Sequence, residues 1–294
     1  MKRVLVTGAG GQVGSRFVEK AALRSDELVV IPLTRSELDI ADSESVEQAI
    51  HFHRPDAVVN LAAYTDVDGA EKEVNEAFEV NAIAPGILAR HCQMAQVDFV
   101  HISTDYVFDG QSDKPYRVED PTGPIGVYAR SKWEGEEAVR AVFDGDHSSK
   151  AKHWIVRAAW IYDSRGKNFM QTMVQLAQRG IPLRVVNDQW GSPTAAEPFA
   201  DALLELVLKR DQVTSGTWHY GTLGPTTWYE FAKAIFAEMS LEVELSPCTT
   251  EEFPTPTARP KFSYLNPHPL ARALGRNPIL WRDELRQVIL KNPS

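Results

Sequence analysis

Short apolar runs recur along the first half of the chain, separated by longer stretches in which apolar positions repeat every three to four residues. The short runs predict β-strands near residues 4–6, 28–31, 56–61, 97–102 and 153–157. The longer stretches predict helices near residues 12–24, 43–51 and 71–94. We expect the last of these to break at Pro85, because an interior proline removes a backbone hydrogen-bond donor. Apolar strands that alternate with helices are typical of a parallel sheet covered on both faces.

Beyond Trp160 the alternation weakens, and glycine and proline become more frequent. Residues 207–219 and 228–239 still predict a helix end, a strand and a helix. Residues 249–260 contain three prolines and predict an extended loop, and residues 145–150 predict a polar surface loop. The pattern therefore indicates a nucleotide-binding domain followed by a smaller, less regular region.

Composition narrows the classes of protein. With 294 residues, 43% of them hydrophobic, the chain can bury a substantial core. The net charge of −9 argues against a general nucleic-acid binder, because neutralising phosphates requires clustered Lys and Arg. Cys92 and Cys248 lie far apart, and we expect both to be reduced. No apolar run reaches the ~18 residues of a membrane helix and no signal-peptide pattern precedes Val4, so the expected compartment is the cytoplasm.

Three glycines follow the first strand at a spacing that suits a dinucleotide. Residues 7–14 read TGAGGQVG, with Gly8, Gly11 and Gly14 three residues apart, and a predicted helix follows. Glycines permit a tight turn and a close approach to a pyrophosphate, and the helix N-terminus offers free N–H groups. Glycines that only mark a turn are the alternative, which the strand–loop–helix context disfavours. The spacing resembles short-chain dehydrogenases/reductases, in which a Tyr and a Lys four residues apart would be expected downstream.

The end of the second strand bears on the choice of cofactor. NAD-specific folds place an acid there, whereas this segment reads Pro32-Leu33-Thr34-Arg35. A guanidinium can bind a ribose 2′-phosphate, which an acid would repel. Arg35 therefore favours NADPH, with NADH as the alternative cofactor and an ordinary surface charge as the alternative role.

Tyr128 and Lys132 satisfy the expected spacing and share a helix face, so they can contact one ligand. A nearby ammonium stabilises a phenolate and lowers its pKa from about 10. In the reducing direction Tyr128 would donate its proton to the developing alkoxide, while Lys132 would also bond the nicotinamide ribose. Upstream, the strand at 97–102 ends in Ser103 and Thr104, at the sheet edge where ligands of open α/β sheets bind. Either hydroxyl can bond the substrate oxygen, and either can instead cap the strand end.

Together these motifs resemble the dTDP-4-dehydrorhamnose reductase family, within the extended short-chain dehydrogenases/reductases. The resemblance covers most of the chain, up to about Arg259, and its most specific segment is STDYVFDG at 103–110. Its other segments are residues 7–14, 60–65, 80–82, 128–132, 156–160 and 187–194. Ala129 stands where glycine is frequent in related sequences. Ser15 is not an acid, so the metal-bridged assembly of some relatives is not expected, and no His, Cys, Asp and Glu cluster has metal-ligand spacing.

The resemblance implies a set of site residues. Thr104 becomes the hydroxyl of the catalytic triad, with Tyr128 as proton donor and Lys132 as its partner. Thr104, Asp105, Tyr128 and Trp160 would lie beside the sugar, although Trp160 can equally be a core aromatic. Arg259 is a candidate diphosphate contact because its planar fork suits phosphate oxygens, or else a surface Arg in a loop. Cofactor contacts are expected at Gly8, Gly11, Gln12, Val13, Gly14, Arg35, Asp39, Ile40, Ala62, Ala63, Tyr64, Tyr128 and Lys132.

The expected fold class is α/β, a Rossmann-like doubly wound parallel sheet with a smaller, interleaved substrate domain. Residues 1–159 and about 199–227 would bind the dinucleotide; about 160–198 and 228–294 would bind the sugar nucleotide. A homodimer is left open, and neither nucleic-acid nor membrane partners are expected.

The implied reaction transfers hydride from NADPH to the C4 carbonyl of a nucleotide-linked 6-deoxy-4-keto sugar, most simply dTDP-4-dehydrorhamnose to dTDP-rhamnose. A sugar-nucleotide epimerase or dehydratase is one alternative. A dehydratase typically adds an Asp-Glu pair beside the triad hydroxyl, whereas Asp105 is followed by Tyr106. A non-catalytic NADP-binding regulatory subunit is the other alternative, against which the intact set of Thr104, Tyr128 and Lys132 argues.

Overall fold

A parallel sheet of six strands forms the centre of the larger half of the molecule. The computed structural model describes residues 1–145 and 149–291, so the predicted loop at 145–150 lies partly outside the described residues. The strands run in the order β10-β5-β4-β3-β1-β2, and every neighbouring pair is parallel. Their bounds are β1 Lys2–Thr7, β2 Leu28–Leu33, β3 Ala57–Asn60, β4 Asp98–Thr104, β5 His153–Ala158 and β10 Gly216–His219. The predicted strands and the doubly wound parallel sheet are thus confirmed.

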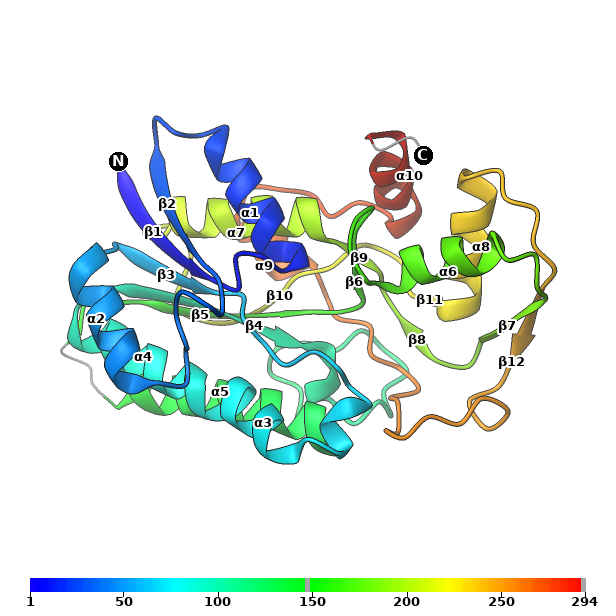
Figure 1. The fold of residues 1–294 in the computed structure, drawn as a ribbon, viewed down its shortest axis with the longest axis horizontal. Helices are drawn as coiled ribbons and strands as arrows, with labels where there is room; N and C mark the ends of the chain where they lie inside the picture. Colours follow the sequence, from blue (N-terminus) through cyan, green and yellow to red (C-terminus); the bar gives the residue numbers. More distant parts are fainter. Residues whose placement is uncertain (146–148, 292–294) are drawn as a thin grey trace.

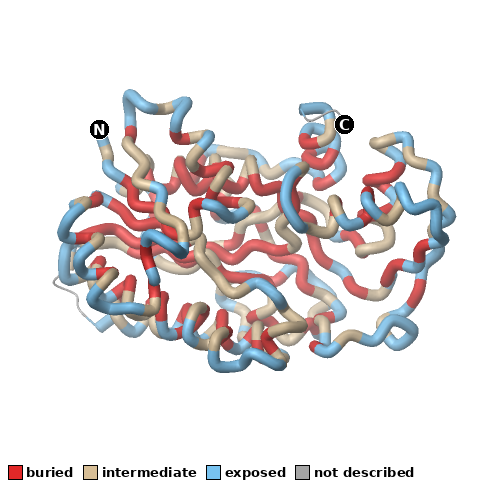
Figure 2. The backbone as a smooth tube through the Cα atoms, viewed as in Figure 1, coloured by how far each residue is buried: buried red, intermediate tan, exposed pale blue. Residues whose placement is uncertain are grey.

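Helices cover both faces of this sheet, as Figure 1 shows. Helices α1 (Gln12–Ala22), α7 (Ala196–Leu208) and α9 (His268–Ala273) pack on one face, and α2 (Ser43–His53), α4 (Ala84–Met94) and α5 (Gly126–Asp144) pack on the other. Successive residues of β1 supply the two cores in turn: Val4 and Val6 face α1 and α7, whereas Leu5 faces α2 and α4. The strands are consequently buried along most of their length (Figure 2).

The predicted break near Pro85 is confirmed. Helix α3 (Val74–Phe78) is followed by a π-helical turn, η2 (Glu79–Ile83), before α4 begins. Pro85 then lies in the first turn of α4, where an amide donor is not needed. The π-helical turn therefore absorbs the change of geometry ahead of the proline.

A separate hydrophobic cluster organises the smaller half, which we call the second lobe: residues 161–195, 226–248 and 281–291. Its core contains Tyr162, Phe231 and Trp281, which come from all three segments. The elements are β6 Ile161–Tyr162, α6 Phe169–Ala177, β7 Leu183–Val186, β8 Trp190–Gly191, β9 Thr194–Ala195, β11 Thr226–Thr227, α8 Trp228–Glu238, β12 Leu245–Cys248 and α10 Trp281–Lys291. Leu270 within α9 and Leu274 just after it pack instead with the core of α1 and α7.

Several smaller expectations can be compared with the structure. Residues 249–260 contain neither helix nor strand, as their prolines predicted. Cys92 and Cys248 are both buried and unpaired, which confirms two free thiols. Within residues 1–145 and 149–291, no helix has the length and apolar character that crossing a membrane requires.

Candidate active site

The glycine loop joins β1 to α1 at the carboxyl edge of the sheet. Gly11 donates its N–H to the Gly8 carbonyl at 2.9 Å, which closes a tight turn. Gly8 has a φ of +65°, and a Cβ there would lie 2.6 Å from the Ala62 nitrogen. A Cβ on Gly14 would collide with the Gly8 carbonyl. Only glycine fits these positions, so the backbone forms the wall that a bound pyrophosphate would face.

The first turn of α1 is suited to an anion. Gly11 is the N-cap residue and makes no side-chain capping bond, and no acidic residue stands in the first turn. The free N–H groups and the positive end of the helix dipole therefore face the loop. Gln12 begins the helix, and its buried Oε1 has no hydrogen-bond partner in the described part of the chain. This glycine-lined cradle fits a dinucleotide pyrophosphate.

A contact that the sequence did not predict ties α1 to the second lobe. Arg16 donates two hydrogen bonds to Asp163, from Nε at 2.7 Å and from Nη2 at 2.6 Å. Gln12 Nε2 also donates to the Lys167 carbonyl at 3.1 Å. The helix that would bind the cofactor is thus fixed against the segment that leads from β6 to α6.

The segment after β3 contains the predicted cofactor residues Ala62, Ala63 and Tyr64. Asn81 in η2 holds this segment, since its Oδ1 accepts from the Tyr64 N–H and its Nδ2 donates to the Tyr64 carbonyl, both at 2.9 Å. Asn81 is 1% exposed. It was recognised as part of a family motif, but its role required the three-dimensional contact.

The residues expected to meet the adenosine ribose follow β2. Arg35 is highly exposed, with 85% of its side chain accessible, and pairs with Glu76 at 3.3 Å. Asp39 is exposed and accepts the Ala41 N–H at 3.0 Å, whereas Ile40 is buried. An exposed ion pair contributes about 0–1 kcal/mol, so Arg35 can exchange Glu76 for a ligand phosphate at little cost.

The three residues expected to carry catalysis meet at the same edge. Thr104 is the last residue of β4, and Tyr128 and Lys132 lie on successive turns of α5. Lys132 is 3% exposed and its Nζ donates to the Ile102 carbonyl at 2.7 Å. Thr104 Oγ1 donates to Asp105 Oδ1 at 3.0 Å and accepts the Tyr106 N–H at 3.2 Å. The hydroxyl at this strand end therefore sits among polar groups that fix its position.

Burial dominates the titration of this site. It raises the pKa of Tyr128 to about 12, although interaction with the Thr104 hydroxyl and the charge of Arg259 act in the opposite direction. It lowers the pKa of Lys132 to about 8, against the effect of Glu136. The sequence led us to expect a Tyr128 pKa below its ordinary value, and this is wrong as far as the protein's own groups are concerned. The loss of water around the phenol raises the pKa by more than the neighbouring protein groups lower it. A phenol with this pKa is fully protonated at neutral pH.

Asp105 and Arg259 also reach the site. Burial raises the pKa of Asp105 to about 7, although hydrogen bonds from the Ser263 and Thr104 hydroxyls act in the opposite direction. Arg259 lies with its Cζ 6.0 Å from the Tyr106 ring centroid and pairs with Asp68 at 2.8 Å. Tyr106 in turn packs edge-on against Tyr128. Arg259 is therefore a partly buried cation close to Tyr128, not an ordinary surface charge.

Trp160 lies where the chain leaves β5 for the second lobe. It adopts a φ of +48°, and its indole stacks on Trp228 with ring centroids 3.6 Å apart. A Cβ on Gly191 would lie 2.6 Å from its Cε2. Packing partners thus approach the indole from both α8 and β8, which fixes its orientation.

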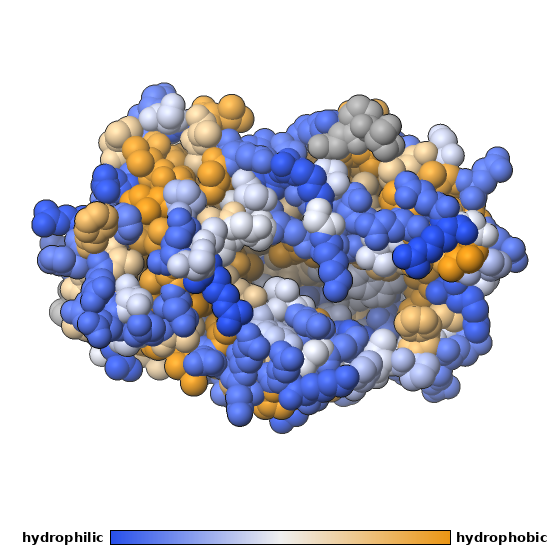
Figure 3. All heavy atoms as spheres, viewed as in Figure 1, coloured by the Kyte–Doolittle hydropathy of each residue, from blue (hydrophilic) through white to orange (hydrophobic). Residues whose placement is uncertain are grey.

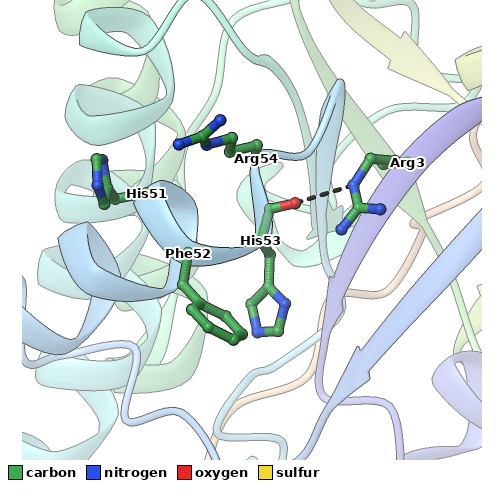
Figure 4. A pocket seen from close by; sticks show the side chains of 5 residues that line it. All are labelled: Arg3, His51, Phe52, His53 and Arg54. Atoms are coloured by element: carbon green, nitrogen blue, oxygen red, sulfur yellow. Dashed lines mark hydrogen bonds between the residues drawn. The ribbon is translucent and has the colours of Figure 1, made fainter.

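A shallow hollow elsewhere on the surface is not part of this site. Arg3, His51, Phe52, His53 and Arg54 line it, and Arg3 donates to the His53 carbonyl at 2.9 Å (Figure 4). It lies beside the amino ends of β1 and β3, opposite to the sheet edge that bears Thr104. The face in Figure 3 is instead hollowed between the sheet and the second lobe.

Comparison with known proteins gives a consistent picture. A family model described as the RmlD substrate binding domain matches residues 1–292. The spore coat polysaccharide biosynthesis protein SpsK of Bacillus subtilis is 39% identical over 294 residues, covering 100% of this chain and 99% of that protein. A dTDP-4-dehydrorhamnose reductase of Mycolicibacterium smegmatis is 37% identical over 98% of this chain and 85% of its own length.

Solved structures agree with the sequence comparisons. The dTDP-4-dehydrorhamnose reductase of Bacillus anthracis, crystallised in complex with NADP, superposes with a TM-score of 0.90 at 34% identity, over 99% of both chains. The match of the family model over almost the entire length, together with these relatives, shows that the chain belongs to the dTDP-4-dehydrorhamnose reductase family.

Proposed function

We propose that this protein is an NADPH-dependent reductase that converts dTDP-4-dehydrorhamnose to dTDP-rhamnose. The observation that carries the proposal is the meeting of Thr104, Tyr128 and Lys132 beside a glycine cradle at one sheet edge. Relatives that span almost the whole chain bear the corresponding name, and one of them was crystallised with NADP.

Each catalytic group has a distinct task in this reaction. Bound NADPH supplies a hydride to C4 of the sugar, and the former carbonyl oxygen becomes an alkoxide. Tyr128 donates its proton to that oxygen, which its pKa of about 12 permits because the phenol is protonated at neutral pH. Thr104 hydrogen-bonds the same oxygen and orients it. Lys132 has one N–H committed to Ile102, which leaves two for the hydroxyls of the nicotinamide ribose.

Other residues bind the two ligands. Gly8, Gly11 and Gln12 with Val13 and Gly14 would hold the pyrophosphate of NADPH, and Arg35 its 2′-phosphate. Arg259 would turn from Asp68 to the diphosphate of the sugar nucleotide, since both are oxyanions. Asp105 and Trp160 would contact the sugar itself. The second lobe would close the sugar-nucleotide site, with the domain division at residues 160, 199 and 228.

The cellular compartment and the oligomeric state of the protein can also be proposed. Two free buried thiols suit a reducing compartment, and NADPH-dependent sugar-nucleotide reduction fits the cytoplasm. The protein would act as a monomer or as a homodimer.

The decisive experiment follows NADPH absorbance with purified protein and dTDP-4-dehydrorhamnose, and identifies the product by NMR. Turnover that requires the keto sugar and yields dTDP-rhamnose supports the proposal. A protein that binds NADPH without turning over would be a regulatory subunit. Release of an epimerised or dehydrated sugar nucleotide without consumption of NADPH would indicate the other enzyme classes.

A further inference from the structure

We propose that Glu136 is a positioning residue for the catalytic lysine: fixed by Arg157, it places a permanent negative charge one helical turn behind Lys132 and keeps that lysine protonated during turnover. The inference rests on the proposed reductase function, because it assigns a role within the same site. Glu136 lies outside the sequence motifs, whereas Arg157 falls within the segment 156–160 but was given no role there.

The helix brings the three groups into line. Tyr128, Lys132 and Glu136 are spaced by four residues on α5, so they occupy one face, which packs against the sheet. Glu136 is fully buried and Lys132 is 3% exposed. The lysine is anchored on β4 through its bond to the Ile102 carbonyl. Water therefore cannot screen the two charges from each other effectively.

Arg157 fixes the carboxylate in place. It lies on β5, is 2% exposed, and donates from Nε to Oε1 at 2.8 Å and from Nη2 to Oε2 at 2.6 Å. Arg140, one turn further along α5, donates to the same Oε2 at 3.1 Å. These paired hydrogen bonds fix the orientation of the carboxylate.

The pair also keeps Glu136 ionised. Burial is the largest influence and would raise the pKa of Glu136, but the hydrogen bonds and charge of Arg157, with help from Arg140, outweigh it, so the pKa lies below its ordinary value. Glu136 therefore remains negative throughout the pH range in which an enzyme of this kind works.

The charged and titratable groups around Lys132 come from three elements. Helix α5 supplies Tyr128, Glu136 and, through its bond to Glu136, Arg140; β4 supplies His101, and β5 supplies Arg157. Burial keeps the pKa of His101 well below its ordinary value, so the imidazole is neutral. Burial lowers the pKa of Lys132 to about 8, and Glu136 is the charge that opposes this decrease. Without Glu136, Lys132 would lose its proton at a lower pH.

A purely architectural role is the competing explanation, in which the ion pair only joins α5 to β5. Breaking a buried pair destabilises a fold whatever its neighbours are. The two roles differ in what happens to the pH dependence. Loss of architecture lowers activity by the same factor at every pH, whereas loss of the charge moves the alkaline limb of the profile.

The test measures kcat/KM for NADPH-dependent reduction against pH in the parent enzyme and in Glu136→Gln, which keeps the shape and removes the charge. A nearby opposite charge typically shifts a pKa by one unit or more, so the alkaline limb should move down by about one unit. Activity should then fall about tenfold relative to the parent at pH 9 and less than about twofold at pH 6. If the single variant does not fold, the double variant Glu136→Gln/Arg157→Gln should still move the alkaline limb down, but by less than the single variant, because a positive charge near Lys132 is removed as well.

Asp98→Asn provides the matched control. Asp98 is 4% exposed and pairs with Arg210 at 2.8 Å, but it begins β4 at the end opposite to Thr104. This variant should be less stable than the parent, but the alkaline limb of its kcat/KM profile should stay where it is in the parent. A Glu136→Gln profile parallel to that of the parent, or an equal shift in Asp98→Asn, would overturn the inference. Absence of any turnover in the parent enzyme would instead refute the proposed function.

Discussion

Glu284 on α10 is a buried acid whose removal should stabilise the protein at neutral pH. It is 2% exposed, and its Oε1 accepts the Ala195 N–H at 2.8 Å. It borders a cavity of about 160 Å³ that Tyr220 and Thr222 also line. Burial raises its pKa from 4.5 to about 8, against the weaker effect of the Ala195 hydrogen bond. Within residues 1–145 and 149–291 no cation forms an ion pair with it, so the folded chain holds this carboxyl in its neutral form at pH 7.

The sign of the effect follows from where the proton is bound. Between pH 4.5 and about 8 the folded chain retains a proton that the unfolded chain has lost. The free energy of unfolding therefore decreases as the pH rises through this window. At about 1.4 kcal/mol per pH unit, the cost to the parent reaches about 3 kcal/mol at pH 7 and about 1 kcal/mol at pH 5. Glu284→Gln is neutral in both states, keeps the acceptor for Ala195, and avoids this cost.

Urea unfolding at pH 5 and pH 7, followed by tryptophan fluorescence, measures the difference. Trp281 and Trp228 lie in the second lobe and report on its unfolding. The free energy of unfolding of the variant should exceed that of the parent by about 2 kcal/mol more at pH 7 than at pH 5. Glu242→Gln, on an exposed residue of the same lobe, should change nothing at either pH. A Glu284→Gln variant that is less stable than the parent at pH 7, or equally shifted at both pH values, would refute the reasoning.

Three further variants test the site. Tyr128→Phe should lower kcat by about 10²–10⁴-fold with NADPH affinity unchanged, because the proton donor is lost; steady-state rates within about threefold of the parent would remove Tyr128 from the mechanism. Arg35→Ala should weaken NADPH by about 1.5–3 kcal/mol and spare NADH, and kinetics with both cofactors would reveal a structural role if both weakened equally. Trp160→Ala should lower the Tm through the lost stack on Trp228 and raise the KM for the sugar nucleotide with little change for NADPH. Equal weakening of both ligands would leave Trp160 with packing alone.

Local patterns were enough to predict the sheet. An apolar run such as residues 97–102 predicts a buried strand without knowledge of its neighbours in space. Pro85 likewise predicts a break in the helix by itself. The second lobe was less predictable, because strands such as β8 and β9 are two residues long and carry no periodicity. They exist because segments distant in sequence, such as those of Tyr162 and Trp281, bury one another.

The candidate site shows the same division. The four-residue spacing placed Tyr128 and Lys132 on one face, and the strand end placed Thr104 beside them. Glu136 follows Lys132 at the same four-residue interval, yet only the contact between Glu136 and Arg157 shows that the carboxylate is held in place. The direction of the Tyr128 pKa could not be read from residue types, since it depends on how completely water is excluded.

The packing of α1 against α7 has a consequence for synthesis on the ribosome. Phe17 and Ala21 of α1 bury their side chains with Phe199 and Leu203 of α7, which follow more than 170 residues later in the chain. At about 5–20 residues per second, the chain between these helices takes roughly 10–40 s to emerge. During that interval the part of the apolar face of α1 that α7 later covers has no native partner and is accessible to chaperones. Nascent chains arrested before Ala196 has emerged from the ribosome should therefore bind chaperones. Chains from which α7 has emerged as far as Leu208 should bind them no longer.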